Sequence, residues 1–291
     1  MAYSSVLVGR AEPRDHIVDV LIAERAPRLA SGPAWPILHP ALYAVLDYRK
    51  ARRMADAIAP LSGQAALEFV SRLLEVNVTV RGLDRDPATG LFVAVCNHPT
   101  GIADGIAVFD ALSGVRPDTV FYANSDAARV ASGFDDVLIP VEWVEEKRTR
   151  LRTRLTLVRT REAMESGRGL MIFPSGRLSR RRGGVLSDPP WAGSAFSVAR
   201  KYEAPIVPMH LTGPWSTLFH LFDRFSGELR DITLFHELLN KRGKAFTLTI
   251  GRPVAPGALA SDPANAAESM KRFVEQALSG NADAEFAGEQ V

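Results

Sequence analysis

The stretch "LFVAVCNHPTGIADG", residues 91–105, contains a short apolar run, a turn with proline and glycine, and the start of a second apolar run. An apolar run without polar alternation is typical of a strand that is buried on both faces, as in a parallel sheet. The run "GLMIF", residues 169–173, has the same character. Both runs therefore predict central strands of a sheet that is covered by helices.

Short β-type runs alternate with helical runs along most of the chain. The predicted strands are "NVTVRG" (77–82), "LFVAVCN" (91–97), "TVFYAN" (119–124), "VLIPVEW" (137–143), "GLMIFP" (169–174), "APIVPMHL" (204–211) and "FTLTIGRP" (246–253). Helices are predicted at about 105–112, 146–166, 191–202 and 228–241. This alternation predicts the α/β class, with a mainly parallel mixed sheet flanked by helices.

The domain organisation follows from the remaining patterns. Residues 36–76 have apolar positions at three- and four-residue spacing, which predicts helices. We therefore expect an N-terminal helical arm at 1–62, an α/β domain at 63–262, and a C-terminal helix with a flexible tail at 263–291. On the arm, aromatic and aliphatic residues precede cations in "WPILHPALYAVLDYRK" (35–50), which suits contact with a membrane interface. A helix that packs on a protein core is the alternative.

Composition excludes several classes of protein. With 291 residues, 46% of them apolar, the chain can bury a sizeable core, and its apolar runs end before the roughly 18 residues of a membrane span. Cys96 is the only cysteine, so neither an internal disulfide nor a cysteine cluster for a metal can form. We expect no metal and no cofactor. The first twenty residues lack the pattern of a secretory signal. We expect a cytoplasmic protein, peripheral on the inner face of the cell membrane.

Positive charge is concentrated between Lys147 and Arg182. This segment has twelve Lys or Arg and two Glu, a net charge of +10, so the rest of a chain with net charge +2 carries about −8. Such asymmetry points to an anionic partner: nucleic acid, an acidic protein or lipid phosphate. Nucleic acid is the least favoured, because no aromatic residues interleave with the arginines. The helical run "KRTRLRTRLTLVRTREAM" (147–164) suits an anionic bilayer or an acidic carrier protein, and equally an ordinary surface helix.

The first candidate site lies in the opening stretch, because α/β sheets bind ligands beyond the carboxyl ends of their strands. His98 follows the predicted strand, and Asp104 precedes a helical run. Asp104 can be a helix cap and Asn97 a turn residue. Alternatively, the Asp104 carboxylate can accept the Nδ1 proton of His98 and leave Nε2 as a general base. Cys96 is expected to be a small buried apolar residue and no nucleophile.

The second candidate site is "GLMIFPSGRLSRRRGG", residues 169–184. Free backbone N–H groups and guanidinium groups after a strand can hold a phosphate or an oxyanion, although an exposed basic loop is the simpler alternative. Ser175 lacks the first glycine of the Gly-x-Ser-x-Gly turn, which argues against a serine hydrolase.

Together, "NHPTGIADG" (97–105) and "FPSGRLSRR" (173–181) resemble motifs one and three of the glycerolipid (lysophospholipid) acyltransferase superfamily, with its PlsC-like fold. Most members have four residues between the histidine and the aspartate, whereas five separate His98 from Asp104. This spacing resembles the hemolysin-like branch, whose acyltransferase domain occurs alone or fused to an N-acyltransferase in ornithine-lipid synthesis. Residues 188–213 and 238–254 also resemble that branch, and the similarity covers roughly residues 65–255.

The resemblance implies transfer of a fatty acyl group from an acyl carrier protein or coenzyme A thioester to a membrane lysolipid, of lysophospholipid or lyso-ornithine-lipid type. It implies that His98 is the general base and that Asp104 orients it. Gly176 and Arg177 would bind a phosphate or headgroup, and Pro208 would shape the acyl-chain site. The full set of substrate-binding residues that it implies is Asn97, Thr100, Gly101, Gly105, Phe173, Pro174, Ser175, Gly176, Arg177, Arg180 and Pro208.

Two departures from the commoner motifs bear on the acceptor. Ser175 stands where the third motif commonly has glutamate, and the second motif, which contacts glycerol phosphate, is not clear between residues 120 and 143. Acyl transfer is therefore better supported than a glycerol-phosphate acceptor. A lipid- or membrane-binding protein that has kept the fold and lost the chemistry is the alternative.

Overall fold

The computed structural model describes residues 15–85, 87, 89–142, 148–182 and 185–288. The chain forms two compact units, each built from several segments. The helical unit comprises Met1–Glu75, Ser125–Leu138 and Ser216–Arg242, and the sheet unit comprises Val76–Asn124, Ile139–Trp215 and Gly243–Val291. The predicted domains were continuous segments, whereas two internal segments of the chain join the N-terminal helices.

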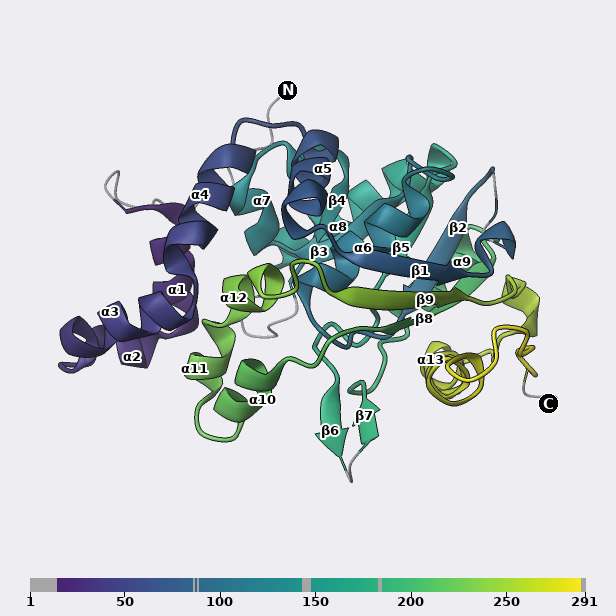
Figure 1. The fold of residues 1–291 in the computed structure, drawn as a ribbon. Helices are drawn as coiled ribbons and strands as arrows, with labels where there is room; N and C mark the ends of the chain where they lie inside the picture. The colour runs from purple at the N-terminus through teal and green to yellow at the C-terminus, as the bar shows by residue number, and fades with distance from the viewer. Residues whose placement is uncertain (1–14, 86, 88, 143–147, 183–184, 289–291) are drawn as a thin grey trace. The chain divides into compact units, whose positions relative to one another are not determined.

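Seven strands form one sheet in the order β1-β9-β8-β2-β5-β3-β4 (Figure 1). Their bounds are β1 (Asn77–Arg81), β2 (Phe92–Cys96), β3 (Val120–Asn124), β4 (Leu138–Val141), β5 (Gly169–Ile172), β8 (Ile206–Thr212) and β9 (Ala245–Ile250). The pairs β1–β9, β2–β8, β2–β5 and β3–β5 are parallel, and β8–β9 is antiparallel. The predicted α/β class with a mainly parallel mixed sheet is confirmed.

All seven predicted strands of this sheet are present, and their ends differ from the prediction by no more than three residues. Residue 143, at the end of the fourth predicted strand, lies outside the described residues. Every residue of β2 and β5 is buried, as their continuous apolar sequences predict. The arginine-rich pair β6 (Arg180–Arg182) and β7 (Val185–Ser187) was not predicted; it forms a separate two-stranded sheet.

Helices cover both faces of the sheet. The sheet unit contains α6 (Ile102–Leu112), α8 (Arg150–Glu165), α9 (Ser194–Lys201), α13 (Pro263–Arg272) and the π-helical turn η5 (Phe273–Leu278). Val93 and Val95 of β2 belong to the core cluster with α8, α9, α13 and η5, whereas α6 packs near β1 and β9. Residues 146 and 147, where the second predicted helix begins, lie outside the described residues.

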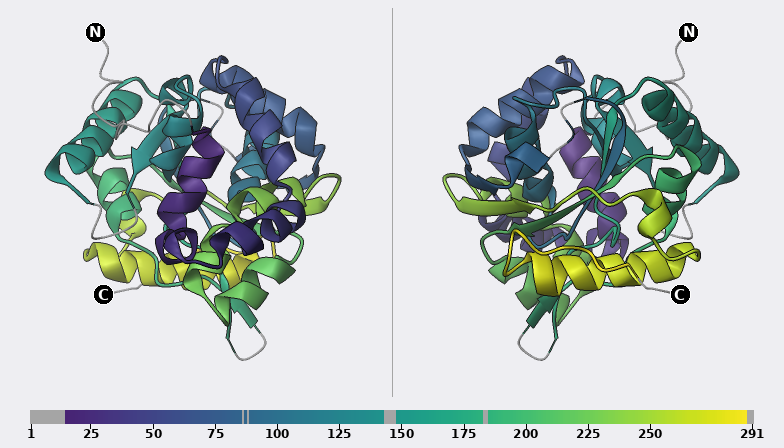
Figure 2. Two further views of the ribbon diagram at one scale, coloured as in Figure 1. Left: turned by 90° about the vertical axis from the view of Figure 1, so that its left-hand side faces the viewer. Right: turned by 90° about the vertical axis from the view of Figure 1, so that its right-hand side faces the viewer.

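The C-terminal segment differs from the flexible tail predicted above. After η5 the chain packs back onto the sheet unit, where the Phe286 ring meets the Phe273 ring edge-on with centroids 5.5 Å apart. Arg85 donates hydrogen bonds to the Ala282 carbonyl and to Asp283. Residues 289–291 lie outside the described residues. The right-hand view of Figure 2 shows α13 and this segment in yellow.

The helical unit contains α1 (Ile17–Arg25), α2 (Pro27–Ser31), α3 (Trp35–Val45), α4 (Tyr48–Ile58), α5 (Gly63–Leu74), α7 (Asp126–Val130), α10 (Thr217–Asp223), α11 (Gly227–Asp231) and α12 (Leu234–Leu239). The helices predicted between residues 36 and 76 correspond to α3, α4 and α5. No residue of α3 is buried, and Ile37, Leu38 and Val45 are exposed. This exposure agrees with the predicted membrane contact of the arm, which stays a prediction. Within the described parts of the chain, no helix is both long enough and apolar enough to span a bilayer.

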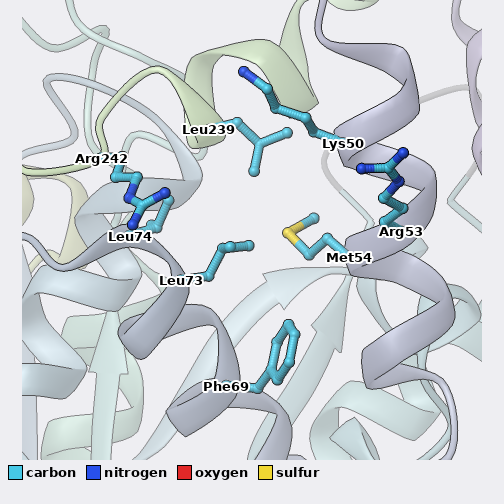
Figure 3. A pocket seen from close by; sticks show the side chains of 8 residues that line it. All are labelled: Lys50, Arg53, Met54, Phe69, Leu73, Leu74, Leu239 and Arg242. Atoms are coloured by element: carbon cyan, nitrogen blue, oxygen red, sulfur yellow. The ribbon is translucent and has the colours of Figure 1, made fainter.

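The helical unit has a pocket of about 280 Å³ between its helices (Figure 3). Apolar side chains form most of its wall, and three cationic side chains complete it. The lining residues are Lys50, Arg53, Met54, Phe69, Leu73, Leu74, Leu239 and Arg242. None of the predicted site residues lines this pocket.

Candidate active site

The loop between β2 and α6 carries the first candidate site. Gly101 has φ of +106°, a backbone conformation that side chains disfavour, and α6 begins directly after it. Asp104 is the third residue of α6, and its Oδ2 accepts hydrogen bonds from the N–H groups of Thr100 (2.9 Å) and Gly101 (3.0 Å). The carboxylate therefore satisfies backbone donors at the start of the helix.

The same carboxylate orients His98. Asp104 Oδ2 lies 2.8 Å from His98 Nδ1, and Oδ1 accepts the Thr100 hydroxyl. Asp104 is fully buried, and the His98 side chain is 17% exposed. A carboxylate at this atom keeps the proton on Nδ1 and leaves Nε2 able to accept one. Asp104 therefore has both of the contacts considered for it: it accepts from backbone N–H groups at the start of α6, and it contacts the His98 ring.

Phe173 fixes the plane of the imidazole. Its ring stacks on the His98 ring with centroids 4.4 Å apart and an angle of 25° between the planes. Phe173 directly follows β5, which is hydrogen-bonded to β2, so the sheet brings the two rings together. The sequence predicted that Phe173 contacts the substrate, which stays a prediction; the structure places its ring against the proposed base.

A tight turn follows Phe173. Gly176 has φ of +58° and donates from its N–H to the Phe173 carbonyl (3.0 Å). The Ser175 hydroxyl donates to the Arg177 carbonyl (2.8 Å). Pro174 is buried at the start of the turn, while Arg177 is exposed. Arg177 lies two residues before Ser179, whose N–H donates to the His98 carbonyl, and an exposed guanidinium there has the chemistry to bind an anion.

A second carboxylate, Asp188, holds the backbone of His98. Its two oxygens lie 3.1 and 3.2 Å from the His98 N–H nitrogen, and it also accepts from the Ser179 hydroxyl and from Trp191 Nε1 (2.9 Å). Ser179 returns a bond from its N–H to the His98 carbonyl (2.8 Å). Burial raises the pKa of Asp188 above its ordinary value. Asp188 thereby ties together the loops of both candidate sites.

The C-terminal helix supports Asp188 from behind. Glu275 of η5 accepts from the Asp188 N–H (2.7 Å) and from the Ser187 hydroxyl (2.8 Å). Lys271 of α13 donates to Glu275 (2.6 Å) and to Ser187 (2.9 Å). The position of His98 thus depends on a chain of polar contacts that ends in the C-terminal helix.

Several residues predicted to bind substrate have other contacts in the structure. The buried Asn97 amide donates to the Leu211 carbonyl (2.9 Å) and accepts from its N–H (2.7 Å), so it joins the ends of β2 and β8. Thr100 and Gly101 hold Asp104, as described above. Pro208 is buried within β8 opposite Val95, inside the sheet and not at its edge.

The other two predicted substrate contacts are less informative. Gly105 lies on α6, where an added Cβ would meet open space, so close packing does not require glycine there. Arg180 begins β6 and is half-buried.

Cys96 is fully buried, and burial raises the pKa of its thiol, which agrees with its prediction as a small apolar residue.

Asp188, Trp191 and Glu275 were not predicted as site residues. The stretch "DPPW", residues 188–191, contains a signal that could have indicated a role in the site, because an acid and a tryptophan directly follow the basic loop. On its own, an acid beside two prolines is typical of a turn.

The chain is similar to known acyltransferases. Residues 77–212 match the Acyltransferase family. The lyso-glycine lipid O-acyltransferase of Phocaeicola vulgatus is 28% identical over 194 residues, 65% of this chain and 68% of that protein. The lyso-glycine lipid O-acyltransferase of Bacteroides thetaiotaomicron is 26% identical over 194 residues, which cover 65% of this chain and 70% of that protein.

The protein is therefore an acyltransferase. More particularly, the match to the Acyltransferase family and the two O-acyltransferase relatives support a member of the glycerolipid acyltransferase superfamily. The resemblance of the two sequence motifs to that superfamily is confirmed.

Among solved structures, the 1-acyl-sn-glycerophosphate (LPA) acyltransferase PlsC from Thermotoga maritima is similar, with 15% identity and a TM-score of 0.48. The similarity covers 91% of this chain and 96% of that one.

Proposed function

We propose that this protein transfers a fatty acyl group from a thioester of acyl carrier protein or coenzyme A to a hydroxyl group of a lysolipid, with His98 as the general base. The contact of 2.8 Å between His98 Nδ1 and Asp104 carries the proposal, because it lies at the carboxyl end of a central strand. The relatives support an oxygen acceptor, since both are named O-acyltransferases of lyso-glycine lipid.

The chemistry needs one base and no covalent intermediate on the enzyme. Nε2 of His98 takes the proton of the acceptor hydroxyl as its oxygen attacks the carbonyl carbon of the thioester. The C–O bond forms, the C–S bond breaks, and the thiolate that leaves takes the proton back from the imidazolium. Asp104 stabilises the imidazolium between these steps, because its carboxylate faces the protonated Nδ1.

Arg177 and the turn at Gly176 provide the anion site of this proposal. The guanidinium is exposed two residues before Ser179, which is hydrogen-bonded to His98. It would bind either the phosphate of the donor's pantetheine arm or an anionic headgroup of the acceptor.

The proposed place of action is the inner face of the cell membrane. On α8, Leu151 and Leu157 are exposed among arginines, and Leu155 and Val158 are half-buried. The apolar side chains of this helix are therefore only partly covered by the protein. An anionic bilayer or an acidic carrier protein would complement this basic helix.

The test is acyl transfer by purified His98→Ala protein. Acyl carrier protein and coenzyme A thioesters are each combined with lyso-glycine lipid, lyso-ornithine lipid and lysophospholipid, and products are measured by mass spectrometry. We expect kcat to fall by about 10²–10⁴-fold, while the melting temperature stays near that of the parent. His210→Gln, which changes another half-buried histidine of the sheet unit, is the matched control.

Full activity of the His98→Ala protein would refute the role of His98. Absence of transfer by the parent with every donor and acceptor in the panel would refute the proposed function.

A further inference from the structure

The hairpin of β6 and β7 extends away from the main sheet (Figures 1 and 2). Its strands pair in antiparallel register, with Arg181 opposite Leu186 and Arg180 opposite Ser187. A two-stranded hairpin alone is marginally stable in water. A surface that covers this hairpin would therefore stabilise it.

Apolar side chains of the hairpin are turned to solvent. Val185 is 67% exposed and Leu186 is 37% exposed. Because cross-strand partners share a face, Leu186 lies beside Arg181. The Arg181 guanidinium carbon lies 5.6 Å from the centre of the Trp215 ring, and Trp215 is 42% exposed. One face of the hairpin therefore presents an aliphatic, a cationic and an aromatic side chain together.

The charge of this segment is of one sign. Residues 177–187 include four arginines and no Asp or Glu. In a bilayer, anionic headgroups lie above the hydrocarbon chains. Arginines can pair with the headgroups while the exposed apolar side chains beside them contact the hydrocarbon. Tryptophan favours that interface, and each basic residue near an anionic bilayer contributes about 1 kcal/mol.

Both ends of the hairpin are attached to the backbone of His98. Ser179, before β6, donates to the His98 carbonyl, and Asp188, after β7, accepts from the His98 N–H. Three residues per strand extend about 10 Å, close to the roughly 5–8 Å of the polar layer on each side of a bilayer. A hairpin whose outer end lay in that layer would hold the His98 loop at the level of the headgroups.

We propose that the β6–β7 hairpin docks on an anionic lipid bilayer and presents His98 to a lysolipid within it. The role of His98 rests on the proposed function, whereas the bilayer contact does not. A lysolipid favours the bilayer by about 0.8 kcal/mol for each buried CH₂ of its chain. A docked enzyme can meet this acceptor without first drawing it into water.

Vesicle co-sedimentation of the full chain tests the docking surface. Vesicles of phosphatidylcholine with phosphatidylglycerol are compared with vesicles of phosphatidylcholine alone. We expect Val185→Ser combined with Leu186→Ser to weaken binding about tenfold, and Arg181→Gln about fivefold, on anionic vesicles only. Val115→Ser, which changes an apolar residue 43% exposed after the end of α6, is the matched control. Unchanged binding by the hairpin variants, or an equal loss in the control, overturns the proposal.

Tryptophan emission gives a second readout. Trp215→Phe should abolish the blue shift that anionic vesicles induce, and Trp35→Phe on α3 should keep it. The reverse result would assign the docking surface to the N-terminal arm and overturn the proposal.

Activity separates docking from chemistry and from a protein partner. The His98→Ala protein should bind vesicles like the parent, so a loss of catalysis leaves the docking result readable. The hairpin variants should acylate a lysolipid dispersed in non-ionic detergent normally and fail on vesicles. If they bind vesicles normally and lose transfer only from acyl carrier protein, the hairpin contacts that protein and the proposal is wrong.

Discussion

Two carboxylates hold His98, and they act on different parts of it. Asp104 contacts the imidazole ring from the same loop, six positions along the chain. Asp188 contacts the backbone N–H from 90 positions away, on a loop that Glu275 of the C-terminal helix supports. The protonation pattern of the ring and the place of the ring in space therefore depend on separate parts of the sheet unit, which substitutions can perturb one at a time.

The largest effect is expected from Asp104→Asn. The amide can still accept backbone N–H groups at the start of α6, but it lacks the charge that stabilises a protonated imidazole. We expect kcat to fall by about 10²–10⁴-fold, with a small change in melting temperature. Steady-state kinetics and thermal unfolding measure both. Asp110→Asn on the same helix is the control. If the Asp104→Asn protein keeps the kcat of the parent, the contact between Asp104 and the His98 ring is only structural.

A smaller effect is expected from Asp188→Asn. The amide nitrogen cannot accept, so one of the donors His98 N–H, Ser179 and Trp191 loses its partner. We expect kcat to fall about tenfold with little change in KM, since a bond to a charged acceptor is worth about 1.5–3 kcal/mol.

The control for Asp188 lies at the opposite ends of the strands. Asp118 accepts from the Gly169 N–H at the start of β5 and pairs with Arg116. Asp118→Asn should lower stability without lowering kcat. Equal losses of kcat in both variants would show that any hydrogen-bonded carboxylate of the sheet unit has this effect.

The smallest effect is on the pH dependence of stability, where these two aspartates should differ in sign. Burial raises the pKa of Asp188 above its ordinary value of 3.8, so its contribution to stability is present below pH 3.8 and is lost as pH rises through the raised pKa. The Arg116 guanidinium lowers the pKa of Asp118 from 3.8, so its contribution is present above pH 3.8 and is lost as pH falls.

Urea unfolding of the parent and the two Asn variants across this pH range tests the signs. The parent's stability relative to the Asp188→Asn protein should decrease with rising pH, by at most about 1.4 kcal/mol per pH unit. Relative to the Asp118→Asn protein, it should increase. Slopes of the same sign would contradict the environment described for Asp188.

The sequence predicted those features that depend on neighbouring residues. The continuous apolar runs of β2 and β5 identified central strands, because only a strand covered on both faces has that pattern. His98 and Asp104 were paired correctly in space, because a strand end and a helix start leave little freedom to the loop between them. The missed hairpin has three arginines in one strand and no apolar alternation, so its sequence is typical of an exposed loop.

Features that depend on the order of strands were not predictable from local patterns. Asp188 and Glu275 meet only because α13 and η5 pack on the sheet unit, 87 positions further along the chain. In the sequence, Asn97 is typical of a turn residue. Its hydrogen bond to Leu211 forms only because β8 lies beside β2 in the sheet. The segments Ser125–Leu138 and Ser216–Arg242 have ordinary helical or loop composition, and nothing in them indicates that they belong with the N-terminal helices.

The double use of Asp104 has a consequence for the evolution of this fold. Its carboxylate both accepts backbone N–H groups at the start of α6 and faces His98 Nδ1, whereas among the described residues the imidazole of His98 holds no backbone group. In a descendant that had stopped catalysing, selection for folding would still retain the aspartate, while the histidine would be free to drift. Among proteins of this fold, a retained histidine is therefore the more informative mark of a working enzyme.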